Sequence, residues 1–152
     1  MNKKIDKEAV QAWIQLHRAH RLLIERVESS LKSGGLPPLA WYDVLLELNR
    51  EKSIGLRQYE IGEKILLSKH NLSRLIDRLE KNHLVARYAC TEDGRGNRVK
   101  ITGEGIKKMK KMWPVYSQSI QENFGVKLDS SELLKLRQVL KKLQFETKTL
   151  NK

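Results

Sequence analysis

Residues 58–102 constrain the fold of this 152-residue chain more than any other stretch, because the spacing of apolar residues changes within it from helical to strand-like. Ile61 and Ile65 lie four residues apart and predict a short helix over residues 59–65. After a tight turn, Ser68 is expected to cap a second helix, since its hydroxyl can accept a hydrogen bond from a free backbone N–H. The inward face of that second helix is expected to hold Leu72, Leu75, Ile76 and Leu79.

A β-hairpin is predicted to follow the second helix. Residues 84–90 open with a strand-like pattern, and residues 98–101 alternate polar and apolar side chains, as a half-buried strand does. The segment between them, Asp-Gly-Arg-Gly-Asn at 93–97, has the glycines and short polar side chains of a turn. The stretch therefore predicts helix, turn, helix and hairpin.

The outer face of the second predicted helix carries residue types that bind nucleic acid. Arginine binds the edge of guanine, asparagine binds the edge of adenine, and serine can bind either base. Lysine binds phosphate. A solvated helix surface is the alternative interpretation of the same face. The residues expected to face the major groove are Lys69, His70, Asn71, Ser73 and Arg74. Ser68 is expected to cap the helix, whose N-terminus then receives a phosphate.

The hairpin favours the DNA-binding interpretation. Arg95 lies at its tip and is expected to enter the minor groove, where the negative potential is strongest. Asp93 is expected to hold Arg95 through an ion pair. Arg78, Arg98 and Lys100 are expected to contact the phosphate backbone.

These segments resemble the MarR family of winged helix-turn-helix regulators. Residues 68–85 are similar to its recognition helix and the Leu-Glu-Lys-x-Gly-Leu-Val exit. Asp93-Gly94-Arg95 resembles its Asp-x-Arg wing signature, and Ile101-Thr102 with Gly105 resembles its Leu-Thr-x-x-Gly. Helix lengths on both sides also fit, so the resemblance covers nearly the whole chain.

The resemblance implies a homodimer whose two chain ends pack across a two-fold axis, and a repressor that a small ligand releases from DNA. Two positions depart from the family pattern. His83 stands where the family usually has glycine, so a left-handed backbone there would carry a cost. Leu66 lies near a position where glycine is common in the turn between the two helices.

Long helices are predicted on both sides of this segment. The first runs from about Asp6 to Leu31 and ends at two glycines, and a second spans residues 39–48. Thr102 can cap a helix that continues through Pro114, with a kink, to about residue 124. Asp129 and Glu132 form a capping-box pattern before a last helix that is expected to end near residue 147.

We therefore predict a mainly α protein with a small β-wing, forming a single domain over residues 1–152. Residues 39–102 form the winged helix-turn-helix lobe, and residues 6–33 and 103–149 form a dimerisation module. The first helix would be roughly 38 Å long, too long to be buried within a small domain. The apolar residues expected at the dimer interface are Val10, Leu16, Leu23, Leu133, Leu136, Leu140 and Leu143.

Charge indicates a polyanionic partner. The formal net charge is +12, which favours nucleic acid first and an anionic membrane surface second. The N-terminus is charged with no apolar run behind it, and no stretch approaches the roughly 20 apolar residues of a membrane span. The single cysteine fits a reducing cytoplasm, where we expect the protein to act without a membrane.

Aromatic residues suggest an effector site. Trp13, His17, Trp41 and Tyr42 lie in the region where the resembled family binds small effectors, so a small apolar or phenolic effector is one hypothesis, and core packing is the other. His17 and His20 could share a metal, but no further ligands complete a site, so no metal or cofactor is predicted. Cys90 could sense oxidants, although a half-buried strand cysteine is the alternative.

No catalytic signature is present: the sequence holds no glycine-rich phosphate loop, no Gly-x-Ser-x-Gly and no His-Glu-x-x-His. The sequence therefore predicts a sequence-specific DNA-binding transcriptional regulator, not an enzyme, that binds a pseudo-palindromic operator as a homodimer. A non-specific architectural DNA-binding protein and a winged-helix protein-interaction module are the alternatives. The operator, the effector, the regulated genes and the choice between repression and activation do not follow from the sequence.

Overall fold

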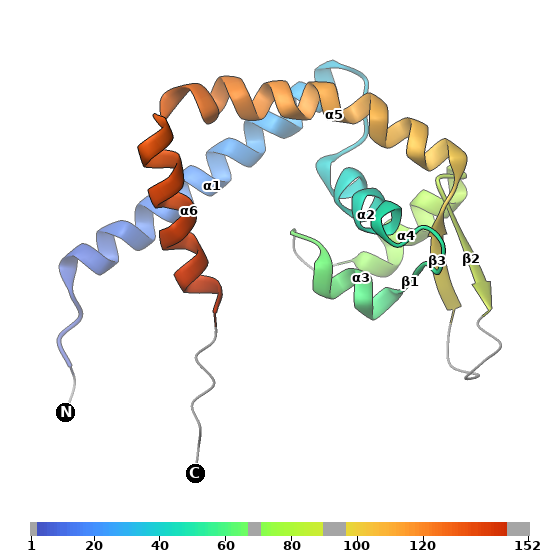
Figure 1. The fold of residues 1–152 in the computed structure, drawn as a ribbon, viewed down its shortest axis with the longest axis horizontal. Coiled ribbons are helices and arrows are strands. Elements are labelled where there is room, and N and C mark those ends of the chain that lie inside the picture. The colour runs from blue at the N-terminus through green and yellow to red at the C-terminus, as the bar shows by residue number, and fades with distance from the viewer. Residues whose placement is uncertain (1–2, 67–70, 90–96, 146–152) are drawn as a thin grey trace, which may run out of the picture.

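The computed structural model describes residues 3–66, 71–89 and 97–145, and it shows a mostly helical chain with a small antiparallel sheet (Figure 1). Helices α1 and α5 pack along each other, and the remaining elements before α5 gather into a lobe at one end of this pair. The predicted fold class, mainly α with a β-wing, is confirmed. The elements in chain order are α1 (Lys7–Ser33), α2 (Leu39–Arg50), β1 (Leu56–Arg57), α3 (Gln58–Lys64), α4 (Leu72–Lys81), β2 (Val85–Ala89), β3 (Asn97–Ile101), α5 (Gly103–Asn123), the 3-10 turn η1 (Gly125–Lys127) and α6 (Ser130–Gln144).

The hydrophobic core lies mostly in the lobe and extends to α1 and α5, which contribute Val27, Leu31, Met109 and Met112. The sheet of the lobe has the order β1-β3-β2, with Val85 opposite Ile101 and Leu56 opposite Val99. The residues predicted to face inward from α4 do so: Leu75 is half-buried, and the other three are buried. The core side chains that are fully buried in the lobe include Val44, Leu45, Leu48, Ile61, Ile76, Leu79, Val85 and Val99.

Local capping residues set most helix ends where the sequence predicts them. The Asp6 carboxylate accepts a hydrogen bond from the backbone N–H of Glu8 (3.0 Å). At the other end of α1, Gly35 adopts a φ of +68°, and the N–H of Leu36 donates to the carbonyl of Leu31 (2.9 Å). The Asp129 capping box is also formed, with 2.8 and 3.2 Å bonds to Glu132.

Three features of the secondary structure differ from the prediction. The expected N-cap at Ser68 is wrong: α4 begins at Leu72, after Asn71, whose left-handed φ of +65° is one that asparagine tolerates better than most residues. β1 was not predicted, because two residues are too few to show an alternating pattern. The last helix ends at Gln144, a turn earlier than expected.

His83 adopts the left-handed conformation that its family-like position requires. Its φ is +60°, and the N–H of Leu84 donates to the carbonyl of Leu79 (3.0 Å) to close the end of α4. The Thr102 hydroxyl donates to the His83 carbonyl (2.6 Å) and accepts from the N–H of Gly105 (3.0 Å). Thr102 therefore caps α5, as predicted, and also fixes the exit of α4.

Gly105 lies where α5 presses against this exit. A Cβ at Gly105 would collide with the carbonyl oxygen of Leu84 and come within 2.7 Å of the Ile101 side chain. Glycine is thus required here for close approach, not for a special φ. The helix then continues through Pro114, as predicted, and the expected kink stays a prediction.

We expect Gly105→Ala to lower the free energy of unfolding by about 1–3 kcal/mol, because backbone must move to admit the methyl group. Gly103→Ala is the matched control on the same helical turn, since no atom lies within 4 Å of its added Cβ. It should leave stability within about 1 kcal/mol of the parent chain. Urea denaturation of both variants measures the difference, and equal stabilities would contradict the close contact.

Candidate nucleic-acid interface

The exposed side of α4 is the first part of the candidate interface. Asn71, Ser73, Arg74 and Arg78 are all exposed, while Leu72, Ile76 and Leu79 are buried on the opposite side. Helix α4 is therefore held by its apolar face and presents a polar, basic face to solvent. Such a face can offer guanidinium and amide donors to base edges and phosphates.

Several predicted site residues fall outside the described residues. Ser68, Lys69 and His70 precede α4, and Asp93 and Arg95 belong to the segment between β2 and β3. Cys90 lies in the same segment. Their assigned roles therefore stay predictions from the sequence.

Arg98 and Lys100 on β3 have partners within the fold, which sequence reasoning missed. The Arg98 guanidinium donates to the Gly55 carbonyl (3.3 Å) and lies 3.9 Å from the Glu60 carboxylate. The Lys100 ammonium lies 4.6 Å from the centroid of the Tyr88 ring, a cation–π contact. Both side chains are half-buried and help to hold the sheet together.

Arg87 is a positioning residue that the prediction did not include. Its guanidinium lies 2.7 Å from Asp77 and 3.2 Å from Glu80, both on α4. The second oxygen of Glu80 also accepts a hydrogen bond from the backbone N–H of Arg87 (3.0 Å). These contacts join strand β2 to α4, so the two elements are held in one orientation.

We expect Asp77 and Arg87 to be coupled in a double-mutant cycle to alanine by about 0.5–1 kcal/mol of unfolding free energy, since the Arg87 side chain is only 24% exposed. The control is the i,i+3 pair Glu104 and Lys107, whose side chains are 66% and 75% exposed. Its coupling should stay below about 0.5 kcal/mol. Thermal or urea unfolding measures both cycles. A coupling for Asp77 and Arg87 no larger than the control would show that the contact does not hold the wing.

The four predicted effector residues do not form one cluster in this chain. The rings of Trp13 and His17 contact each other edge-on, with their centroids 4.3 Å apart, on the exposed N-terminal half of α1. This half of α1 lies far from α2 (Figure 1). Tyr42 instead stacks against Trp113, with ring centroids 6.0 Å apart, and contacts Tyr116 edge-on with centroids 5.2 Å apart. Trp41 lines a separate cavity. Burial raises the pKa of both Tyr42 and Tyr116, so these phenols stay protonated near neutral pH.

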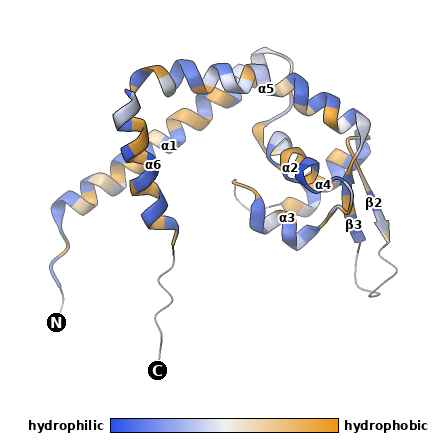
Figure 2. Cartoon of the chain, in the orientation of Figure 1, coloured by the Kyte–Doolittle hydropathy of each residue, from blue (hydrophilic) through white to orange (hydrophobic). Residues whose placement is uncertain are grey.

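The terminal helices expose much of their apolar surface. No residue of α6 is buried, and the colouring in Figure 2 shows apolar residues recurring along α1 and α6. Leu133, Leu136 and Leu140 line a hollow of about 480 Å³ together with Phe124. Leu143 is exposed, as is Leu16, while Val10 and Leu23 are partly covered. The residues predicted for dimerisation are thus unburied within one chain.

The described residues form neither a membrane-spanning helix nor a metal-binding cluster. None of the helices described is both long and apolar enough to cross a membrane. Within residues 3–66, 71–89 and 97–145, no three side chains of His, Cys, Asp or Glu lie together as a metal site would need.

A short helix, a turn, a second helix with a basic face and an attached hairpin define a winged helix-turn-helix protein. The MarR family model matches residues 35–96. The HTH-type transcriptional regulator MhqR of Bacillus subtilis (strain 168) is 28% identical over 142 residues, which cover 93% of this chain and 95% of that protein.

Solved structures agree with this match. AbsC, a MarR family transcriptional regulator from Streptomyces coelicolor, is 27% identical with a TM-score of 0.80, over 93% of this chain and 95% of that one. Sco3205 from the same organism, crystallised in complex with DNA, has a TM-score of 0.83 at 22% identity, over 94% and 89% of the two chains. The chain is therefore similar to the MarR family model over residues 35–96 and, over most of its length, to transcriptional regulators.

Proposed function

We propose that this protein is a sequence-specific DNA-binding regulator that binds a pseudo-palindromic operator in the cytoplasm as a homodimer. The exposed polar face of α4, held to the wing through Arg87, is the observation that carries the proposal. The DNA complex of the structurally similar Sco3205 supports the same role for this fold. A net charge of +12 adds the non-specific attraction that DNA binding requires.

In this proposal α4 enters the major groove with Asn71, Ser73 and Arg74 toward the bases, and Arg78 contacts the backbone. Lys69, His70 and Arg95 are proposed as further contacts from their sequence positions. Arg98 and Lys100 act mainly by supporting the sheet, because their cationic groups are already engaged with Glu60 and Tyr88. Asp93 keeps the supporting role proposed for it, whereas Ser68 does not cap α4 and its proposed phosphate contact rests on its sequence position alone.

A homodimer would supply two such helices. Two copies related by a two-fold axis read half-sites that lie roughly 34–36 Å apart, one turn of DNA. The uncovered apolar faces of α1 and α6 are the surfaces proposed to meet. Repression that a small ligand relieves is the regulatory behaviour we propose, on the strength of the family resemblance.

The first experiment compares DNA from just upstream of the coding region with a shuffled duplex at several salt concentrations. A regulator that reads an operator should bind it about a thousandfold or more tightly than the shuffled DNA. If each subunit neutralises about 4 to 5 phosphates, the logarithmic salt slope should be near −7 to −9. Equal binding to both duplexes would instead favour the architectural alternative, which the high positive charge also allows.

We expect Arg74→Ala to weaken operator binding by about 1–3 kcal/mol and to narrow the gap between operator and shuffled DNA, because a base contact is lost. Lys110→Ala is the control, since Lys110 is an exposed cation on α5, outside the proposed interface. Fluorescence anisotropy at fixed salt measures both variants. An unchanged operator affinity for Arg74→Ala would remove this residue from the reading surface.

We expect Leu140→Asp to shift the protein from dimer to monomer, near the chain mass of 17.7 kDa, because a charge would then lie inside the apolar face of α6. Lys141→Asp, at the adjacent exposed position, should leave the dimer intact. Sedimentation equilibrium gives the masses, and circular dichroism checks that α6 still forms. A parent chain that is monomeric at all concentrations would contradict the dimer.

A further inference from the structure

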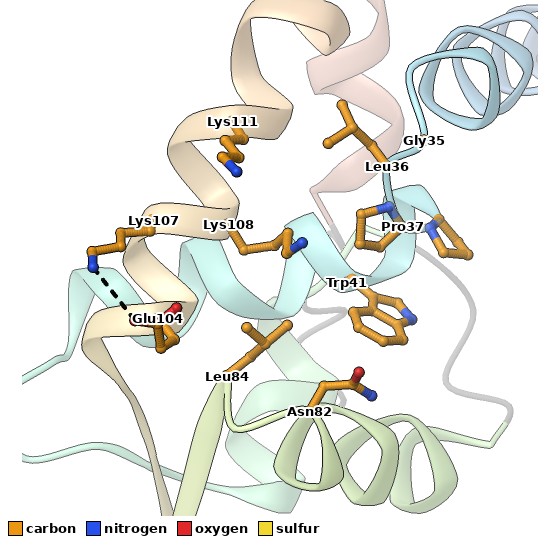
Figure 3. Close-up of a pocket in the computed structure, with 11 residues that line it drawn as sticks. Gly35, Leu36, Pro37, Trp41, Asn82, Leu84, Glu104, Lys107, Lys108 and Lys111 are labelled. Atoms are coloured by element: carbon orange, nitrogen blue, oxygen red, sulfur yellow. Dashed lines mark hydrogen bonds and ion pairs between the residues drawn. The ribbon is translucent and has the colours of Figure 1, made fainter.

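A cavity of about 530 Å³ lies where the lobe meets α5 (Figure 3). Its walls come from four parts of the chain: the turn after α1, the start of α2, the exit of α4 and the first turns of α5. Of the four residues predicted for the effector site, Trp41 lines this cavity, whereas Trp13, His17 and Tyr42 do not. The cavity is therefore a different site from the aromatic cluster around Tyr42.

One side of the cavity is apolar and suited to a flat ring. The Trp41 indole lies between Pro37 and Leu84 in Figure 3, with Leu36 above them. Trp41 is only partly buried, so one part of its surface packs on the core and another part lines the cavity. Aromatic ligands commonly bind against surfaces of this kind.

The facing side is basic. Lys107 is paired with Glu104 at 3.4 Å, but Lys108 and Lys111 have no hydrogen-bond or ion-pair partner among the described residues. They lie three residues apart, so their side chains project from the same side of α5, and Figure 3 shows both over the cavity. Two unpaired ammonium groups that can converge on one position favour a single group with two negative charges.

We propose that this cavity binds an aromatic phosphate monoester, with the phosphate between Lys108 and Lys111 and the ring against Trp41. A phosphate monoester carries about −1.5 to −2 charges near neutral pH, whereas a carboxylate carries only one. Lysine also binds phosphate well as a point charge. The volume of the cavity accommodates a ring system with its phosphate and adjoining groups.

The test uses three ligands with one ring system: 1-naphthyl phosphate, 1-naphthoate and 1-naphthol. They are titrated into the full chain without DNA by isothermal titration calorimetry, so the result is independent of the proposed DNA-binding function. We expect the phosphate to bind at least about tenfold more tightly than the naphthoate, and the naphthoate more tightly than the naphthol. Inorganic phosphate, which lacks the ring, should bind more weakly than 1-naphthyl phosphate.

Matched lysine variants locate the site. Lys108→Gln and Lys111→Gln should each weaken 1-naphthyl phosphate about tenfold, while leaving 1-naphthol nearly unchanged. Lys110→Gln, from an exposed residue that does not line the cavity, should bind like the parent chain. Trp41→Phe should weaken all three naphthyl ligands by similar factors. Thermal unfolding of each variant confirms that it is folded.

Three results would overturn the proposal. The first is equal affinity for the phosphate and the naphthoate, and the second is full binding by both lysine variants. The third is the lack of saturable binding by the parent chain at millimolar 1-naphthyl phosphate. Failure of operator binding in the separate DNA experiment would leave this titration unaffected.

Discussion

The meeting point of α4, β2 and α5 is the constraint on which the rest of the structure depends. His83 turns the chain in a left-handed conformation, and Leu84 then bonds back to α4 through its N–H and to Thr102 through its carbonyl. Thr102 caps α5 from the same place, and Gly105 lets that helix approach. Helix α4, strand β2 and helix α5 are therefore joined through one set of short hydrogen bonds. A displacement of one of them must strain the others, since packed interiors do not deform smoothly.

The elements that depend on local chemistry were predictable from the sequence. The apolar spacing of α4, the glycines after α1, and the caps at Asp6, Thr102 and Asp129 act within a few residues of each other, so a window of sequence contains the whole interaction. The left-handed backbone of His83 was expected from the family resemblance alone, because His83 stands where the family usually has glycine. The N-cap of α4 was wrongly predicted at Ser68, whereas Asn71 precedes the helix in a left-handed backbone conformation.

The interactions that the sequence did not predict are those between residues far apart in the chain. Arg87, Arg98 and Lys100 look alike as basic residues of a predicted hairpin, yet each has a different partner: Asp77 and Glu80, Gly55 and Glu60, and the Tyr88 ring. Only the pairing of β1 with β3 brings Gly55 and Glu60 near Arg98, and β1 was too short to predict. A count of positive charges therefore overstates the number available to DNA. Among the described residues predicted to contact DNA, Asn71, Ser73, Arg74 and Arg78 stay exposed on or directly before α4, which is why the proposed reading surface centres there.

The division of apolar surface between lobe and terminal helices has a further consequence. The lobe buries its own core, but α6 buries none of its residues and α1, with 27 residues, is roughly 40 Å long. An isolated helix of 15 residues is marginal in water, and the described residues leave no side chain of α6 buried, so further packing would stabilise it. A second copy would provide this packing and would also fix the distance between two recognition helices.

The basic cavity lies between the lobe and α5, so a bound ligand would contact both parts. Such a ligand can shift their relative orientation only if it binds one arrangement more tightly than another. A ligand held by the lysines on α5 and the tryptophan on α2 would distinguish such arrangements, because any change in the spacing of these two helices alters both contacts at once.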